Sequence, residues 1–505
     1  MKYLLSLVFI SINLFPNSVY SQNDSLKQIS ASSTNNSIKE LVNDINSLLD
    51  NPDFSNAMIG ICVQSMETGE YLYKHNEAKN LVPASNLKLF TTSTALEYLG
   101  KDFKYTTSLY LRGRILAGGE FEGNIIIRGS GDPTFCNLYQ KNAIDIFDSW
   151  VAKLDTVGIT SIRGNIIGDD GYFDDNYYAP GWAWEDMTSS FSAQVSGLSA
   201  FENSVEITLT PSDSVGERAD FSAYPDNSYI QIVNNVRTAR RYASDININR
   251  NVNSNLIELN GQIILDTSKK EKNVQKIQVA VENPCLYFLN IFRDRLKERR
   301  INFRGTLLQA RDLNEKILYQ SLIPFTEYES IPLSEIIKVI NKQSNNLSTE
   351  LLLKTIGKEI SGVGSFSKGV EQVRKYISKL GISPENMSIV DGSGLSRYNL
   401  VSPKYIVALL SGIYHSANKD VFIESLAEPG KKGTLNYRLT SSRAEKFIKA
   451  KTGTMNNISN ISGFVYAKNN EVLAFSIMMN NFTVPLSAAI NLQDLLCMRL
   501  ASFKR

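Results

Sequence analysis

Two pairs of apolar, strand-like segments, one near each end of this chain, constrain its fold most strongly. Residues 57–64 and 69–74 are joined by Met-Glu-Thr-Gly, and residues 460–467 and 471–479 by Lys-Asn-Asn, so each pair predicts a β-hairpin. An isolated hairpin is only marginally stable in water and needs further strands or a helix. The two hairpins therefore predict one shared sheet, which brings both chain ends into a single domain.

The predicted secondary structure changes along the chain between the two hairpins. Residues 105–325 are rich in short alternating strands and turns, whereas helical periodicity dominates at 82–100 and again beyond residue 330. A strand-rich block that separates two parts of one domain is expected to be an insertion. We therefore predict that residues 105–325 are inserted into a domain built from the two chain ends.

The first 21 residues have the pattern of a secretory signal: a basic start at Lys2, an apolar run over 3–15 and a small-residue cleavage site. No later stretch reaches the roughly 18 apolar residues that span a bilayer. We expect an exported, periplasmic protein without a transmembrane anchor, whether soluble or peripherally associated with a membrane. The polar residues 22–36 are expected to be loose, with a helix from about residue 37.

Charge and residue counts exclude several classes of function. The 53 basic and 51 acidic residues leave a formal net charge of +2 without large blocks, so no nucleic-acid partner is expected. The four cysteines are far apart and show no metal-ligand spacing; free buried thiols are favoured, although an exported protein could pair them. The two histidines, His75 and His415, lie in polar turns, which disfavours a Ser-His-Asp triad or a histidine zinc site. We expect no metal and no cofactor.

Ser85 opens the most informative helix, which is predicted over 82–100. Apolar residues recur there at helical spacing, Gly100 is a plausible stop, and Lys88 projects one turn after Ser85 from the same face. A serine is a weak nucleophile until a neighbouring base takes its proton, and a lysine can be that base when burial lowers its pKa. Two further Ser-x-x-Lys matches, beginning at Ser365 and Ser416, lie in a glycine-rich loop and at a polar helix end. Only Ser85 opens an apolar helix.

Two later triplets follow in an informative order. Ser344-Asn345-Asn346 lies between two predicted helices, and Lys451-Thr-Gly-Thr454 lies on a predicted strand. Taken singly, the first triplet is better explained as a helix cap and the second as the end of a strand. Together with Ser85-x-x-Lys88, each on a suitable element, they indicate one catalytic site.

This order resembles that of the penicillin-recognising serine enzymes, whose motifs are Ser-x-x-Lys, Ser-x-Asn and Lys-Thr-Gly. Three further stretches narrow the resemblance: Gly-Ser-Gly-Asp132-Pro, Pro-Gly-Trp182-Ala-Trp-Glu-Asp-Met-Thr and Asp391-Gly-Ser-Gly-Leu-Ser-Arg. From about residue 40 to the C-terminus the chain is similar to the D-alanyl-D-alanine carboxypeptidase/endopeptidase family, the class C low-molecular-mass penicillin-binding proteins (peptidase family S13).

The resemblance implies an α+β fold with a β-lactamase/transpeptidase-like domain, a five-stranded antiparallel sheet flanked by helices, and two nested, mainly β inserted domains. It implies a serine DD-peptidase that cleaves D-Ala-D-Ala termini or D-Ala-diaminopimelate cross-links of peptidoglycan stem peptides and binds β-lactam antibiotics covalently. The expected borders are 1–21 for the signal peptide, 22–104 and 326–505 for the transpeptidase-like domain, 105–169 and 276–325 for inserted domain II, and 170–275 for inserted domain III.

The resemblance also implies roles for the catalytic residues. Ser85 attacks the carbonyl between two D-alanines, and Lys88 is the base for acylation. Ser344 and Lys451 relay a proton to the leaving amine, while Asn346 holds the substrate amide. The resemblance leaves open which lysine acts as the base in each step.

The Lys-Thr-Gly-Thr strand supplies the first substrate-binding residues, Thr452, Gly453 and Thr454. The hydroxyls of Thr452 and Thr454 are expected to receive the terminal carboxylate, and the amides of Ser85 and Thr454 to form the oxyanion hole. The ammonium form of Lys88 is expected to be disfavoured by the helix end and by the nearby Lys451.

A second substrate-binding group, Asp186, Phe191 and Arg397, matches the family's pocket for the diaminopimelate side chain. An acid and a base suit a side chain that ends in both an amine and a carboxylate. Where the family often has Gln after Lys-Thr-Gly-x-x, this chain has Asn456, a departure that bears on one contact of the pocket. The structural alternative for the group is an ion pair beside a core phenylalanine.

Three alternatives to a DD-peptidase are a β-lactamase, a non-catalytic penicillin-binding sensor and an inactive wall-binding protein. A β-lactamase needs a dedicated water-activating glutamate, and the chain shows no such motif. A sensor is normally joined to a membrane segment. An inactive protein is expected to have lost a motif residue, and none is missing here.

Overall fold

The two predicted hairpins pair with each other in one five-stranded antiparallel sheet of the computed structural model, which describes residues 22–240, 244–266 and 272–505. The N-terminal strand β1 lies beside the C-terminal strand β19, from Met58 opposite Asn480 to Ser65 opposite Leu473. This confirms the expected α+β fold. In sheet order the strands are β17 (Ile448–Met455), β18 (Ile458–Tyr466), β19 (Val472–Asn480), β1 (Met58–Ser65) and β2 (Tyr71–His75).

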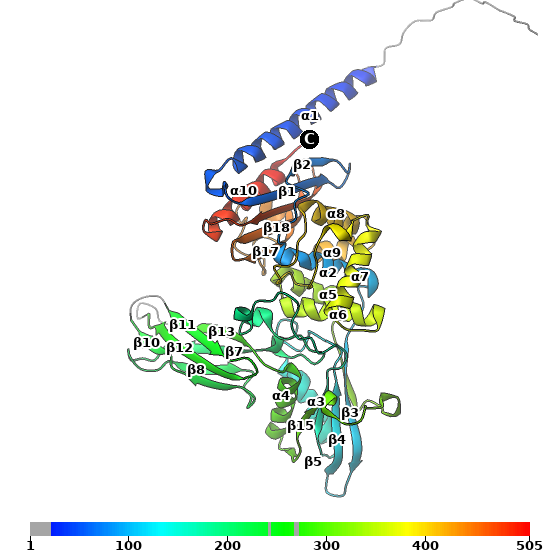
Figure 1. Cartoon of the computed structure of the whole chain (residues 1–505), viewed down its shortest axis with the longest axis vertical. Helices are drawn as coiled ribbons and strands as arrows, with labels where there is room; N and C mark the ends of the chain where they lie inside the picture. The colour runs from blue at the N-terminus through cyan, green and yellow to red at the C-terminus, as the bar shows by residue number, and fades with distance from the viewer. Residues whose placement is uncertain (1–21, 241–243, 267–271) are drawn as a thin grey trace, which may run out of the picture.

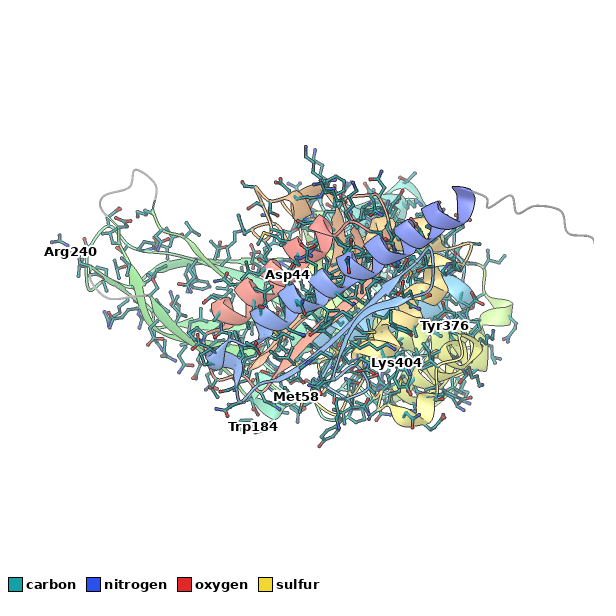
Figure 2. The ribbon with its side chains drawn as sticks, turned by 90° about the horizontal axis from the view of Figure 1, so that it is seen from above. Asp44, Met58, Trp184, Arg240, Tyr376 and Lys404 are labelled. Atoms are coloured by element: carbon teal, nitrogen blue, oxygen red, sulfur yellow. The ribbon has the colours of Figure 1, made fainter. Side chains whose placement is uncertain are left out.

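Helices cover both faces of this sheet. On one face α1 and α10 lie side by side (Figure 2), where Leu41 and Ile45 belong to the same buried cluster as Leu492 and Leu496. Helix α1 begins at Gln22, so the prediction of a loose segment before residue 37 is wrong. The predicted signal peptide, residues 1–21, lies outside the described residues. The helices of this domain are α1 (Gln22–Leu49), α2 (Lys88–Tyr98), α5 (Leu333–Gln343), α6 (Asn346–Ser361), α7 (Phe366–Lys379), α8 (Pro403–Tyr414), α9 (Lys419–Ser425) and α10 (Leu486–Ser502).

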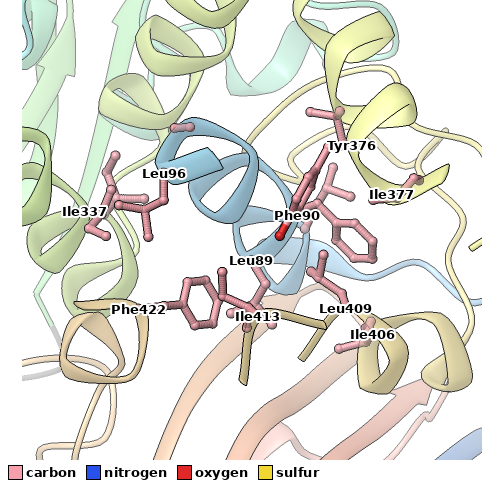
Figure 3. Packing of buried hydrophobic residues seen from close by; sticks show 14 of the residues in the cluster. Leu89, Phe90, Leu96, Ile337, Tyr376, Ile377, Ile406, Leu409, Ile413 and Phe422 are labelled. Carbon is pink, nitrogen blue, oxygen red and sulfur yellow. The ribbon is translucent and has the colours of Figure 1, made fainter. Parts of the chain in front are cut away.

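Helix α2, which follows Ser85, lies at the centre of the helical layer on the other face. Figure 3 shows Leu89, Phe90 and Leu96 surrounded by apolar side chains of α5, α7, α8 and α9. All three are 0–1% exposed. Burial on every side fixes this helix, and with it the position of Ser85 and Lys88.

The inserted residues form two further β units below and beside the first domain (Figure 1). The unit at the foot of Figure 1 is a seven-stranded sheet on which α3 (Ile144–Thr156) and α4 (Pro284–Glu298) pack through an aromatic core. Its strands are β3 (Thr106–Ile115), β4 (Glu120–Arg128), β5 (Ser161–Arg163), β6 (Ile166–Asp169), β14 (Asn302–Phe303), β15 (Leu307–Gln309) and β16 (Thr326–Glu329).

The second inserted unit projects sideways as two small sheets that share an apolar core. One sheet has the order β13-β7-β8, and in the other β12 pairs with β9, β10 and β11. Its strands are β7 (Ser204–Thr210), β8 (Asp220–Tyr224), β9 (Gln231–Asn234), β10 (Arg237–Ala239), β11 (Asp245–Arg250), β12 (Leu256–Ile264) and β13 (Gln275–Ala280).

Strand pairing bears on the borders of the inserted domains. Strand β13 pairs with β7 of domain III up to Ala280, and β16 pairs with β3 of domain II up to Glu329. Both sheets thus extend past the expected limits at residues 275 and 325. We propose the nested arrangement with these two borders moved accordingly. The described structure of residues 170–203 consists of short 3-10 turns, isolated β-bridges and loops, and it contacts α6, where Lys354 pairs with Asp174 at 2.7 Å.

All four cysteines are buried and unpaired, as predicted from their apolar neighbours. Within the described ranges, none of the helices combines the length and the apolar character needed to cross a membrane.

Candidate active site

Ser85 lies in a 3-10 turn, Ala84–Leu87, that leads directly into α2. Ala84 takes a left-handed conformation, with φ +46°, so the chain turns sharply just before the serine. Lys88 is fully buried, and its Nζ lies within hydrogen-bond distance of three oxygens: Ser85 Oγ at 3.0 Å, Asn346 Oδ1 at 2.6 Å and Ser393 O at 2.8 Å. The structure thus brings Ser85, Lys88 and Asn346 together as predicted.

This geometry accommodates both forms of Lys88, since an ammonium can donate to all three oxygens. A neutral amine has two N–H groups and one lone pair. Asn346 Oδ1 and Ser393 O can only accept, and the orientation of Asn346 is set because its Nδ2 donates to Phe191 O at 2.8 Å. In the neutral form the two N–H groups go to these oxygens, and the lone pair is left for the hydroxyl of Ser85.

Burial lowers the pKa of Lys88 from 10.5 to about 7. The charges of Glu350 and Asp391 oppose this change, because each carboxylate favours the ammonium form. The sequence predicted a lowered pKa from burial, from the helix end and from Lys451. Burial under α6 and the 391–394 turn is the larger cause.

Ser344 and Lys451 form a second serine–lysine contact. Ser344 ends α5 in a left-handed conformation, with φ +62°, and Lys451 Nζ donates to its Oγ at 2.9 Å and to Thr452 O at 2.8 Å. Lys451 is also fully buried. Its pKa is lowered well below the usual range by burial first and by the positive charge of Lys88 second.

Strand β17 lies against the Ser85 turn at Gly453. A Cβ at this position would lie 2.8 Å from Pro83 O, 2.9 Å from Ser85 N and 3.0 Å from Asn86 N. Only glycine allows the strand to approach the turn this closely. The close approach carries Thr454 to the cleft beside Ser85, whereas Thr452 is buried.

Ser85 opens onto a cleft of about 430 Å³. Asp186, Phe191 and Arg397 all line it, as predicted. Among the described residues neither Asp186 nor Arg397 has an ion-pair partner; Arg397 donates to Asn456 O at 3.2 Å, and Phe191 is 47% exposed. These contacts are not those of a structural ion pair beside a core phenylalanine. The cleft is lined by Ser85, Ala183, Glu185, Asp186, Phe191, Ser344, Asn346, Gly394, Leu395, Arg397, Thr454, Met455 and Asn456.

Asp186 has a raised pKa. The largest cause is partial burial, the second is the neighbouring Glu185, and Arg397 acts in the opposite direction. A raised pKa means that the surroundings disfavour the charged carboxylate. A bound cation would stabilise that charge, so Asp186 has a property expected of a group that binds a cation.

Sequence reasoning missed two buried carboxylates that support Lys88. Glu350 accepts the backbone N–H groups of Gly392 and Ser393, and Asp391 accepts those of Gly394 and Ser396. Together these two carboxylates hold the 391–396 turn, in which the carbonyl of Ser393 accepts a hydrogen bond from Lys88 Nζ. One available signal was spacing, since Glu350 follows Asn346 by four residues and so shares its helix face.

The two other Ser-x-x-Lys matches have structural explanations. Ser365 caps α7 by accepting the Lys368 N–H, and Lys368 Nζ pairs with Glu371 at 2.7 Å. Lys419 lies over the Tyr414 ring, 3.7 Å from its centroid. Across the described parts of the chain, histidine, cysteine and acidic side chains do not gather in threes as a metal site requires.

The sheet, its helices and the two serine–lysine contacts define a β-lactamase/transpeptidase-like serine enzyme. In structure the chain is similar to penicillin binding protein 4 (dacB) from Haemophilus influenzae, with a TM-score of 0.75 and 24% identity over 90% of this chain and 97% of that one. The same protein complexed with a β-lactam gives a TM-score of 0.72. The chain belongs to the D-Ala-D-Ala carboxypeptidase 3 (S13) family, whose sequence profile matches residues 41–500.

Curated relatives agree with this family. A D-alanyl-D-alanine carboxypeptidase from Actinomadura sp. (strain R39) is 32% identical over 478 residues, which cover 92% of this chain and 85% of the relative. Penicillin-sensitive carboxypeptidase A from Dictyostelium discoideum is 25% identical over 99% of both chains.

Proposed function

We propose that this protein is a serine DD-peptidase that cleaves D-Ala-D-Ala termini or D-Ala-diaminopimelate cross-links of peptidoglycan stem peptides through an acyl-enzyme on Ser85. The observation that carries the proposal is the buried Lys88, held by two acceptors so that its neutral form faces the Ser85 hydroxyl. Family membership supports the substrate class.

In the proposed acylation, neutral Lys88 takes the proton of Ser85 while Ser85 Oγ attacks the D-alanine carbonyl carbon. The amides of Ser85 and Thr454 receive the oxyanion. The C–N bond then breaks, and the leaving amine receives the proton that Lys88 took from Ser85, by way of Lys451 and Ser344. Water next attacks the ester carbonyl, the bond to Ser85 Oγ breaks, the peptide leaves with a new terminal carboxyl group, and the other proton of the water returns to Ser85.

The groups next to this centre are proposed to bind the two ends of the substrate. Asn346 holds the substrate amide, and Lys451, with the hydroxyls of Thr452 and Thr454, docks the terminal carboxylate. At the other side of the cleft Asp186 and Arg397 bind the amine and the carboxylate of the diaminopimelate side chain beside Phe191.

The Asp186→Asn variant is expected to lower kcat/KM for peptides that end in a side-chain amine by roughly ten-fold, because one partly exposed charge-assisted contact is lost. Peptides with a neutral side chain at the same position are expected to be cleaved at the normal rate. Steady-state kinetics on both substrates measure the ratio. An equal loss on both peptides would contradict this role.

Penicillin treatment followed by mass spectrometry tests the proposed function. The adduct is expected on the peptide that contains Ser85, since among the three Ser-x-x-Lys matches only this serine contacts a buried lysine whose pKa is lowered. An adduct on Ser365 or Ser416, or none at all, would refute the proposal.

The β-lactamase alternative finds less support. Glu350 is buried and both of its oxygens accept backbone N–H groups, and it does not line the cleft. It is therefore not placed to activate a water for rapid deacylation.

The proposal includes two further properties. The protein binds β-lactams covalently, and it is exported to the periplasm, as the signal-like pattern of the first 21 residues indicates.

A further inference from the structure

The segment Phe201–Asn203, where the chain enters β7, has an unusual backbone. Three consecutive residues, none of them glycine, take left-handed conformations, with φ +50°, +58° and +48°. Each such residue costs free energy and persists only where the surroundings enforce it. Strain of this kind indicates that the fold requires this segment to have one particular conformation.

Side chains on both sides of the segment enforce its conformation. Asn203 is fully buried, and its Nδ2 donates to Gln194 O at 2.8 Å and to Ser199 Oγ at 2.9 Å. The ring of Phe201 stacks on Phe147, with centroids 6.4 Å apart and an interplanar angle of 16°. The middle residue, Glu202, is therefore presented at a defined place.

Glu202 reaches the catalytic domain at the centre of the Ser344–Asn346 turn. Its Oε1 accepts a hydrogen bond from Asn345 Nδ2 at 2.5 Å. Asn345 is also the N-cap of α6, because its Oδ1 accepts the Ser348 N–H at 2.8 Å. The two ends of the Asn345 amide thus join the inserted segment to the first turn of α6.

The residues on either side of Asn345 contact the two lysines. Ser344 Oγ accepts from Lys451, and Asn346 Oδ1 accepts from Lys88. Ser344 is itself left-handed, so this turn needs external support to keep its shape. A change in the orientation of Asn345 displaces both contacts at once.

We propose that Glu202 is a positioning residue for acylation, an inference that rests on the proposed function. By holding Asn345 it sets the Ser344–Asn346 turn against the two lysines. The strained Phe201–Asn203 segment is the rigid link through which the inserted strands β7 and β13 support the active site. The inserted domain is therefore part of the acylation machinery.

The test measures the acylation kinetics of the full-length protein with a fluorescent penicillin. Glu202→Ala is expected to lower the limiting acylation rate about 10- to 50-fold, as small misplacements of catalytic groups do. Glu202→Gln should stay within about three-fold, because its amide oxygen accepts the same hydrogen bond. The dissociation constant of the initial complex should change less than the rate.

A donor–acceptor exchange separates positioning from mere stability. Asn345→Asp keeps the cap oxygen of α6 but sets a carboxylate against Glu202, and is expected to slow acylation strongly. Adding Glu202→Gln to Asn345→Asp supplies a donor and should restore most of the rate. Glu258→Gln, a matched change on β12 at a glutamate that accepts a hydrogen bond from Asn249 Nδ2, should leave the rate unchanged.

Wild-type acylation by Glu202→Ala would overturn the inference, as would a slow Asn345→Asp variant that Glu202→Gln fails to rescue. If Glu202→Ala does not fold, the comparison of Asn345→Asp with the Asn345→Asp/Glu202→Gln double variant still tests the positioning role of Glu202. A wild-type protein that forms no adduct on Ser85 would refute the proposed function instead, so the two failures are distinguishable.

Discussion

Replacing Lys88 with methionine is expected to slow acylation of Ser85 by about 10²- to 10⁴-fold, the usual contribution of a positioned general base. Methionine has a stem of similar length and is apolar, so it fills the same buried space but cannot accept a proton. The rate constant for labelling by a fluorescent penicillin measures the loss. A variant that is acylated at the wild-type rate would remove Lys88 from the mechanism.

Stability provides the control for this variant. The pKa of Lys88 is lower in the folded state, about 7, than its usual 10.5, so between these values the unfolded chain binds more protons. Stability therefore rises with pH across this window, and the burial of a charged Lys88 costs most below pH 7. Lys88→Met removes that cost, and its Tm at acidic pH should be equal to or higher than that of the wild type. A large fall in Tm would show that the loss of rate came from misfolding.

The same pKa predicts the pH dependence of the wild-type enzyme. Because only neutral Lys88 takes the proton of Ser85, the acylation rate is expected to rise with pH through a midpoint near 7 and then level off. A rate that is flat between about pH 5.5 and 8 would contradict Lys88 as the base.

Gly453→Ala is expected to lower the acylation rate by about 10²- to 10³-fold, the effect of losing one oxyanion donor. The added methyl group would lie within 3.0 Å of three backbone atoms, Pro83 O, Ser85 N and Asn86 N. Backbone atoms cannot rotate away as a side chain does, so β17 must move from the Ser85 turn and carry the Thr454 amide with it. Penicillin labelling measures the rate, and circular dichroism confirms that the variant is folded.

Gly171→Ala is the matched control for Gly453→Ala. At Gly171 the new Cβ meets only one side-chain atom, the Asp169 Oδ1 at 3.0 Å, and no backbone atom, and neither residue lines the Ser85 cleft. This variant should acylate normally. If Gly453→Ala also acylates normally, the close approach of β17 to the Ser85 turn is not required for the reaction.

Features set by short stretches of chain were predictable from the sequence alone. Hairpin patterns at both ends predicted a shared sheet, and β1 pairs with β19 as expected. Helical spacing predicted that Lys88 lies one turn from Ser85 on a buried helix, and the order of three motifs predicted which distant residues would join them. These inferences succeed because periodicity and motif chemistry are local properties.

Only the tertiary structure decided how those residues are supported. The contacts of Glu350 with the 392–393 backbone and of Glu202 with Asn345 join segments far apart in sequence, and no local pattern specifies which carboxylate is buried. The low pKa of Lys88 comes mainly from burial, which exists only once α6 and the 391–394 turn have packed over it. The sequence determined which groups are proposed to perform the chemistry, and packing decided their protonation and orientation, because desolvation and hydrogen-bond geometry arise only in the folded chain.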